Sequence, residues 1–246
     1  MRKVKLETIV RLCDAHIPYH DEDVMNIALK ITRTLRPTTV IIDEWIDFYS
    51  LSKFDKDPKR KLQLQDDLDL THQWLKKLRN ALPRCEIIML ESNHDKRLRK
   101  YLHSKAEELC GLRCLQLEKL LGLESLNIKY RRMYWFRGVL FKHGSIVRNQ
   151  SAYTAKGERD KEGTSGNSGH THRMGSHFKT LRGGQYTWTE GGCLCDPRQA
   201  EYIDGTADWQ QGISGFDFIK DSKRFYPFLI PIIDKKAVFA RRLYTL

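Results

Sequence analysis

The sequence lacks any long apolar run, and this excludes a membrane-spanning helix. A span needs about 18 consecutive apolar residues, and no segment of the 246 residues approaches that length. The first ten residues, MRKVKLETIV, contain basic side chains but no long apolar stretch and no small-residue cleavage site. We therefore expect no signal peptide. These absences predict a cytoplasmic protein with no membrane partner.

Paired cysteine motifs are also lacking. The six cysteines include Cys110-x-x-x-Cys114 and Cys193-x-Cys195, and neither spacing is that of a structural zinc site, which typically uses paired C-x-x-C motifs. Buried free thiols in a reducing compartment are the expected state of these side chains.

Acidic residues are few in comparison with basic ones. The chain has 31 Asp and Glu against 43 Lys and Arg, which gives a net charge of +12. Such an excess favours a polyanionic partner, either nucleic acid or a phosphate-bearing substrate. The length suits one α/β domain, and the sequence shows no internal repeat or linker. We therefore expect a single domain over residues 1–246.

Four short apolar runs each end at polar residues that are good metal ligands. The runs are residues 8–12, 38–42, 86–90 and 139–142, and the ligand-type residues that follow them are Asp14 and His16, Glu44 and Asp47, Asn93 to Asp95, and His143. Buried strands that deliver functional groups at their carboxyl ends have this pattern.

Segments with apolar residues at helical spacing lie between these runs, and the amino-acid composition changes after His143. Residues 21–35, 61–82 and 95–121 have apolar side chains at helical intervals, whereas the segment 156–169 is rich in Gly and Ser and predicts a loop or the end of a helix followed by a loop. From residue 177 onward, aromatic residues and short apolar runs indicate antiparallel strands. The alternation in the N-terminal half predicts an α/β domain.

The spacing of the ligand-type residues favours a metal centre. Asp14-x-His16 and His170-x-His172 place two ligands at positions i and i+2, and on an extended segment such side chains point to the same side. Any one of these pairs is weak evidence. Several clusters that each close an apolar run are much harder to produce by chance, and imidazole, carboxylate and amide oxygens suit a borderline transition metal.

These motifs, in this order, resemble those of the calcineurin-like metallophosphoesterases. The family pattern is D-x-H, then G-D-x-x-D/N, G-N-H-D/E, a lone His and G-H-x-H. The corresponding residues here are Asp14-Ala15-His16, Asp43 to Asp47, Ser92 to Asp95, His143 and Gly169 to His172. The segments YSLSKFDKDP, GHTHRMG and EGGCLCD are similar to those of phage-encoded members, including DNA-repair nucleases, and such a protein would work in the host cytoplasm.

The resemblance implies a fold, a metal pair and roles for individual residues. The expected fold is a four-layer α/β/β/α sandwich, with helical additions around residues 50–82 and 96–135. Two divalent ions, most readily Mn²⁺, with Fe, Zn, Ni or Mg as other options, would activate a bridging hydroxide as the nucleophile. The implied ligands are Asp14, His16 and His172 for one ion, Asn93, His143 and His170 for the other, and Glu44 for both. His94 would act on the leaving oxygen, with Asp95 holding it by a hydrogen bond.

Two departures from the family pattern bear on these roles. Asp43-Glu44 stands where the family has Gly-Asp, so the bridging carboxylate is one methylene longer, or Asp43 is the ligand in a shifted register. The E-x-x-D spacing to Asp47 favours Glu44. Ser92 replaces a glycine that commonly has a positive φ, and this predicts a tolerated or slightly strained backbone there.

The basic residues suggest a substrate. The stretches 56–61, 96–100 and 129–132 are basic, and Arg148 and Arg173 directly follow ligand motifs, which makes them candidates for phosphate contacts. We therefore favour a nuclease, that is, a phosphodiesterase acting on nucleic acid. A phosphomonoesterase acting on a protein or a small molecule and a non-catalytic nucleic-acid-binding module are the alternatives. The sequence neither requires nor excludes a dimer.

Overall fold

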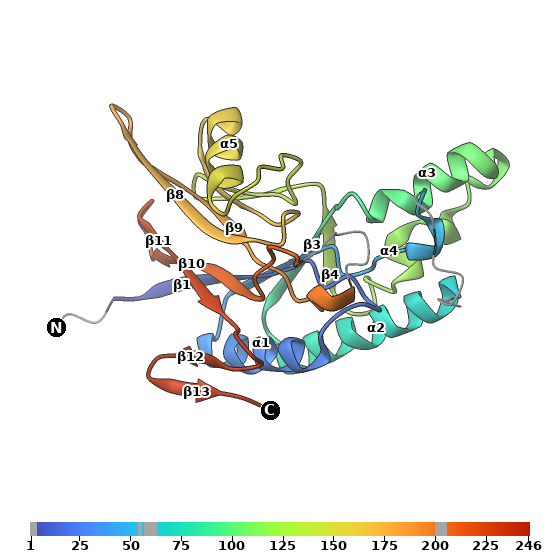
Figure 1. Ribbon diagram of the computed structural model, residues 1–246, viewed down its shortest axis with the longest axis horizontal. Coiled ribbons are helices and arrows are strands. Elements are labelled where there is room, and N and C mark those ends of the chain that lie inside the picture. Colours follow the sequence, from blue (N-terminus) through green and yellow to red (C-terminus); the bar gives the residue numbers. More distant parts are fainter. Residues whose placement is uncertain (1–3, 54–55, 57–62, 200–205) are drawn as a thin grey trace.

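The computed structural model describes residues 4–53, 56, 63–199 and 206–246. Two β-sheets lie face to face, with helices against their outer faces (Figure 1). None of the helices in these described ranges is both long enough and apolar enough to cross a membrane.

The first sheet has six strands in the order β11-β10-β1-β2-β3-β4. Its strands are β1 (Leu6–Cys13), β2 (Thr39–Asp43), β3 (Glu86–Leu90), β4 (Ile128–Arg131), β10 (Gly212–Ile219) and β11 (Phe225–Pro231). Strands β1 to β4 are parallel, whereas β10 pairs antiparallel with both β1 and β11. The carboxyl ends of β1, β2 and β3 therefore meet at one edge of the sheet.

The second sheet has five strands in the order β5-β6-β7-β9-β8. Its strands are β5 (Tyr134–Phe136), β6 (Val139–Phe141), β7 (Ser165–Ser168), β8 (Met174–Leu181) and β9 (Gly184–Gly191). Because β6 and β7 are parallel, the residues that follow them also lie at a common edge. A hairpin of β12 (Ala237–Phe239) and β13 (Arg242–Tyr244) completes the strands.

The helices fall into three groups (Figure 1). Helices α1 (Glu22–Leu35) and α2 (Leu64–Ala81) lie below the first sheet in this view, and α5 (Tyr153–Glu162) lies above the second. Helices α3 (Asp95–Lys105) and α4 (Leu117–Leu120) lie to the right. The short 3₁₀ helices are η1 (Tyr49–Leu51), η2 (Glu107–Leu109), η3 (Arg113–Leu115) and η4 (Pro197–Gln199).

Alternating side chains on the strands build the layers. On β1 to β3, Val10, Ile42 and Met89 belong to a core shared with α1 and α2. The neighbouring residues Ile9, Ile41 and Ile88 face the second sheet, where they meet Phe141 and Phe216. A third, smaller core joins the second sheet to α5 and consists of Leu140, Ala155 and Trp188. This alternation is the period of two expected of a strand buried on both faces. The predicted four-layer α/β/β/α sandwich is confirmed.

Two local predictions hold only in part. Residues 165–168 form the buried strand β7 rather than a loop, because Gly166 lies against Trp188, where a side chain would not fit: an added Cβ would come within 2.5 Å of the ring. The region 96–135 contains helices only as far as Leu120, and β4 and β5 follow. The basic residues at 57–61 lie outside the described residues.

Gly166→Ala should destabilise the protein because the new Cβ would also lie 2.5 Å from the carbonyl oxygen of Leu140, which cannot move without breaking the sheet. We expect a loss of about 1–3 kcal/mol in the free energy of unfolding, measured by urea denaturation. Gly111→Ala is the matched control, because nothing lies within 4 Å of its added Cβ. Equal effects of the two substitutions would contradict this packing.

Candidate metal centre

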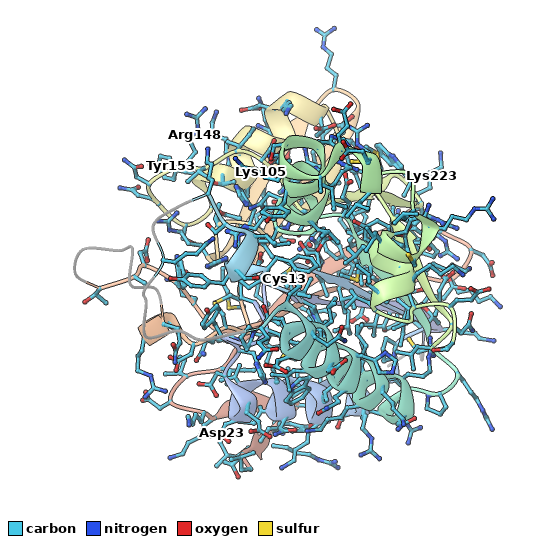
Figure 2. All side chains as sticks on the ribbon, turned by 90° about the vertical axis from the view of Figure 1, so that its right-hand side faces the viewer. Cys13, Asp23, Lys105, Arg148, Tyr153 and Lys223 are labelled. Carbon is cyan, nitrogen blue, oxygen red and sulfur yellow. The ribbon has the colours of Figure 1, made fainter. Side chains whose placement is uncertain are left out.

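The ligand-type residues converge at the edge where the carboxyl ends of the strands meet. Asp14 and His16 follow β1, Glu44 follows β2, and Asn93 and His94 follow β3 in the first sheet. From the second sheet, His143 follows β6, and His170 and His172 follow β7. Figure 2 looks onto this edge, with Cys13, the last residue of β1, near the middle of the view. Segments far apart in the sequence therefore supply one site.

One group of four potential ligands combines both sheets. Asp14, His16, Glu44 and His172 each offer an atom within 4.8 Å of the others, and all four are buried. The Nε2 atoms of His16 and His172 are 2.9 Å apart. Asp47 accepts a hydrogen bond from Nδ1 of His16 at 2.8 Å, which leaves the lone pair of His16 at Nε2, directed at this group.

A second group lies beside the first and shares Glu44 with it. Glu44, His143 and His170 have ligand atoms within 4.8 Å of one another. Nε2 of His143 lies 3.2 Å from Oε2 of Glu44 and 2.6 Å from Oδ1 of Asn93. The two oxygens are hydrogen-bond acceptors. His143, Glu44 and Asn93 therefore each direct an atom with a lone pair to the same point. The predicted ligand residues thus lie close together, and their role as ligands stays a prediction.

The backbone at these positions is in a conformation that L-residues rarely adopt. The φ angles are 52° at both Asp14 and His16, 50° at Glu44, 75° at His170 and 58° at His172. A left-handed conformation at a non-glycine residue costs about 1 kcal/mol or more and tends to cluster at functional sites. Five such residues at the ends of three strands therefore indicate that the side-chain directions are maintained against a local energetic cost.

Buried charge dominates the electrostatics of the site. Burial, reinforced by neighbouring carboxylates, raises the pKa of Asp14 and raises that of Glu44 well above its usual range. Burial also lowers the pKa of His170 to about 4 and that of His172 well below its usual range. Glu44 Oε1 and His172 Nδ1 are buried without a hydrogen-bond partner in the described part of the chain. Neutral imidazoles beside acidic groups form the donor set that a divalent cation requires, so these residues fit a metal pair.

Asp43 is not a member of either ligand group that contains Glu44, and it lies next to the ligand residue His143. Burial raises its pKa, but the charge of Arg11 and a hydrogen bond from His143 outweigh this and lower the pKa below its usual range. Arg11 is itself fully buried, 2.8 Å from Asp43, and it donates to the carbonyls of Lys142 and Asn167. Asp43 accepts from His143 Nδ1 at 2.6 Å and so directs Nε2 toward Glu44.

The carboxylate next to the His94 ring is that of Asp47, not that of Asp95. Nδ1 of His94 is 3.1 Å from Asp47 Oδ2, and Arg97 donates to His94 Nε2 at 2.7 Å. Arg97 is also paired with Asp47 at 2.9 Å. Burial lowers the pKa of His94 to about 3, so its imidazole is neutral near pH 7. Asn93 is exposed and His94 and His170 are only partly buried, which makes them the mouth of the site.

The predicted hydrogen bond from Asp95 to His94 is wrong. The first turn of α3 directs Asp95 away from His94, and its Oδ2 accepts from the backbone of Ser92 and from Tyr130. Of the two outcomes expected at Ser92, a tolerated or a slightly strained backbone, the structure has the first, because Ser92 is not among the residues with a positive φ. Its Oγ accepts from the backbone of Asp95 at 3.1 Å, so Ser92 and Asp95 cap the start of the helix reciprocally.

Arg148 and Arg173 lie together, but their contacts in the described part of the chain do not join the ligand groups. Arg173 donates to the carbonyl of Arg148 at 2.8 Å and pairs with Asp208 at 2.8 Å. Arg148 is exposed and lies toward the rim in Figure 2, away from Cys13. Sequence reasoning missed Arg11 and Arg97. A charged residue inside the apolar run of β1 was the signal for the first, and the basic run after Asn93-His94 was the signal for the second.

An additional buried carboxyl lies beside the site. Asp67 of α2 is fully buried, and neither of its oxygens has a hydrogen-bond partner in the described part of the chain. Burial, with the negative charges of Asp47 and Asp66, raises the pKa of Asp67 to about 7. Ionisation of Asp67 therefore destabilises the folded state.

Comparisons with known proteins identify relatives of the whole chain. No protein-family model matches it. The Gene 54 proteins of Mycobacterium phage L5 and Mycobacterium phage D29 are each 28% identical to it over 242 residues, which cover 92% of this chain and 93% of theirs.

Solved structures with a similar arrangement are Vacuolar Protein Sorting 29 from Cryptosporidium parvum and Vps29 from Chaetomium thermophilum. The first covers 98% of this chain and 99% of its own, with 11% identity and a TM-score of 0.48. The second covers 97% of this chain and 98% of its own, with 11% identity and a TM-score of 0.47.

Arg11→Met should destabilise the protein strongly, because it leaves the Asp43 carboxylate buried without its cation. We expect a loss of roughly 3–5 kcal/mol in the free energy of unfolding, and adding Asp43→Asn should recover part of it. Lys156→Met, which removes the exposed pair with Asp160, should change little. Urea denaturation of the four proteins tests this, and a double variant as unstable as Arg11→Met would refute the pairing.

Asp67→Asn should stabilise the protein, and more so at high pH. The folded-state pKa of about 7 exceeds the unfolded value of about 3.9, so the folded state binds more protons between these values and loses stability as the pH rises. The gain from the substitution should be larger near pH 8 than near pH 5 by about 1–3 kcal/mol. Denaturation in EDTA at both values measures it, and a gain that does not grow with pH would contradict the buried carboxyl.

Proposed function

We propose that this protein is a metal-dependent phosphodiesterase that hydrolyses nucleic acid. The observation that carries the proposal is that Glu44 belongs to both ligand groups. A carboxylate shared by two neighbouring cation sites is the arrangement that a two-metal hydrolase needs. The ligands of one ion would be Asp14, His16 and His172, those of the other Asn93, His143 and His170, and Glu44 would serve both.

Two divalent ions, which we propose to be Mn²⁺, would supply charge for the phosphate oxygens and a water molecule of lowered pKa. The protein's own part is to orient the ligands and to position the phosphate. Asp43 and Asp47 each hold the Nδ1 atom of one ligand histidine, His143 and His16 respectively. This leaves each Nε2 lone pair directed into the site.

His94 and Arg97 are the groups best placed to meet the leaving oxygen. His94 lies 3.4 Å from Glu44, at the partly exposed mouth of the site. Its Nε2 accepts from Arg97, so His94 would donate to that oxygen once the phosphate replaces it as the partner of Arg97 and the ring proton moves to Nε2. Arg97 contacts His94 and retains 19% side-chain exposure. A phosphate bound beside His94 therefore also meets the guanidinium charge. Asp47 holds both side chains in place.

The charge distribution supports nucleic acid as the substrate. Arg99 and Lys100 are exposed on α3, which begins directly at the mouth of the site, and Arg131 and Arg132 are exposed at the end of β4 and directly after it. A polyanionic backbone is attracted to such a surface with an affinity that falls as salt rises. The six cysteines are free, and the similar Gene 54 proteins are those of phages. We infer that the protein works in the cytoplasm of a phage host.

A paired hydrolysis assay tests the function. Purified protein with Mn²⁺ is offered bis-p-nitrophenyl phosphate, p-nitrophenyl phosphate and a supercoiled plasmid, each with and without EDTA. We expect diester turnover and loss of supercoiling, both abolished by EDTA, with plasmid cleavage suppressed by salt far more than turnover of the small diester.

The other outcomes identify the alternatives. Turnover of the monoester alone would make the protein a phosphomonoesterase. No activity on any of the three substrates, with two metal ions still bound, would make it a non-catalytic binding module. Either result would overturn the proposed nuclease.

His94→Ala should reduce diester turnover by about 100-fold or more while leaving close to two metal ions per chain, because His94 is proposed to act on the leaving oxygen and not as a ligand. Metal content is measured by mass spectrometry of digested protein, alongside steady-state turnover. His177→Ala is the control, since that histidine lies on β8. Loss of metal together with activity would show that His94 is a ligand.

A further inference from the structure

His143 lies on the loop between β6 and α5, and a buried glutamate of α5 holds this loop. Glu158 is 0% exposed. Its Oε1 accepts hydrogen bonds from the backbone N–H groups of Ser145 at 2.9 Å and Ile146 at 3.2 Å. In the described part of the chain, neither of these N–H groups donates to a backbone carbonyl. The two residues that follow Gly144 therefore depend on this carboxylate for their position.

The same carboxylate also holds the residue before His143. The Nζ atom of Lys142 lies 2.6 Å from Oε2 of Glu158 and 2.6 Å from Oε1 of Glu162. Burial raises the pKa of Glu158, but the Lys142 amine and the loop N–H groups outweigh this and lower the pKa below its usual range. The side chain is therefore ionised near pH 7, and a charged acceptor forms stronger hydrogen bonds than a neutral one. Glu158 thus holds the chain on both sides of His143.

Close packing at Gly144 leaves the loop little freedom beside His143. The φ of Gly144 is 105°, and an added Cβ would lie 3.1 Å from Cβ of Ser168 and 3.4 Å from Oε1 of Glu158. Any other residue would be strained there. Asp43 fixes the direction of the His143 ring, whereas Glu158 fixes the backbone that carries the ring.

We propose that Glu158 is a positioning residue that holds His143 for one ion of the metal pair and not for the other. His143 belongs to only one of the two ligand groups. Among the described residues, the Glu158 carboxylate has no hydrogen bond or ion pair with Asp14, His16 or His172 of the other group. A ligand that supporting residues hold in place before the ion arrives binds that ion more tightly. The inference rests on the proposed function, because it assumes the metal pair.

Titration of the metal-free protein with Mn²⁺, followed by calorimetry, tests this role. Glu158→Leu removes the acceptor and keeps most of the side-chain volume. We expect the Kd of one ion to rise about tenfold and that of the other to stay as in the unaltered protein. Glu162→Leu is the matched control, because Glu162 lies on the same helix at the same distance from Lys142 but accepts from no loop N–H group in the described part of the chain. Equal weakening of both ions in Glu158→Leu, or of neither, would overturn the proposal.

A rescue variant separates the loop hydrogen bonds from the pairing of charges. Glu158→Gln keeps an oxygen for the two loop N–H groups but turns its amide protons toward the Lys142 amine, and Lys142→Met removes that repulsion. The double variant Glu158→Gln/Lys142→Met should therefore bind both ions nearly as the unaltered protein does. Glu158→Leu/Lys142→Met leaves no unpaired charge that would prevent folding, but it should retain the weakened Kd. Equal binding by the two double variants would show that the loop hydrogen bonds do not position His143.

A measurement without metal separates failure of this proposal from failure of the proposed function. Nδ1 of His143 lies 2.6 Å from its acceptor on Asp43, and NMR in EDTA follows the exchange of the Nδ1 proton with water. We expect this exchange to be about tenfold faster in Glu158→Leu than in Glu162→Leu, because the loop opens more often when its anchor is lost. Equal exchange in the two variants would contradict the positioning role. If the unaltered protein binds no Mn²⁺, the metal-dependent nuclease fails, and the exchange still decides whether Glu158 holds His143.

Discussion

Burial of several carboxylates in one small space is the constraint on which the rest of this site depends. Asp14, Asp43, Glu44 and Asp47 are all at most 6% exposed, and burying an uncompensated charge costs several kcal/mol. Arg11 compensates Asp43 from inside the sandwich, and Arg97 compensates Asp47 from the mouth. Among the described residues, Asp14 and Glu44 have no such arginine partner, and their raised pKa values reflect it. A pair of divalent cations would satisfy these two residues.

The layered fold and the site are connected through the strand ends. Parallel strands of both sheets stop at one edge, and at three of these ends the chain turns through left-handed residues that carry the ligands. The orienting acids Asp43 and Asp47 flank Glu44 at the end of β2, and they fix the tautomers of His143 and His16.

Much of this was predictable from the sequence. Apolar runs that end in ligand-type residues predicted β1, β2, β3 and β6 and the convergence of their ends, because strand periodicity and ligand spacing are local properties. The resemblance in motif order supplied the sandwich. The pairing of Asp43 with Arg11 was not predictable, because the two residues are 32 positions apart and meet only when β1 and β2 pair in the first sheet.

The errors have physical causes. Adjacency in the sequence suggested that Asp95 supports His94. However, α3 begins at these residues and directs their two side chains to different sides, and Asp47, which follows another strand, contacts His94 instead. The glycines and serines of β7 resembled a loop, but they leave the space that Trp188 fills. In each case tertiary packing decided what local composition could not.

Electron paramagnetic resonance during titration with Mn²⁺ tests the central claim most directly, because it reports whether two ions share a ligand. The account predicts that the unaltered protein binds two ions per chain with an exchange-coupled signal, and that Glu44→Gln weakens binding and removes the coupling. An uncoupled signal at full occupancy in the unaltered protein, or coupling that survives Glu44→Gln and is lost in Asp43→Asn, would contradict a metal pair bridged by Glu44.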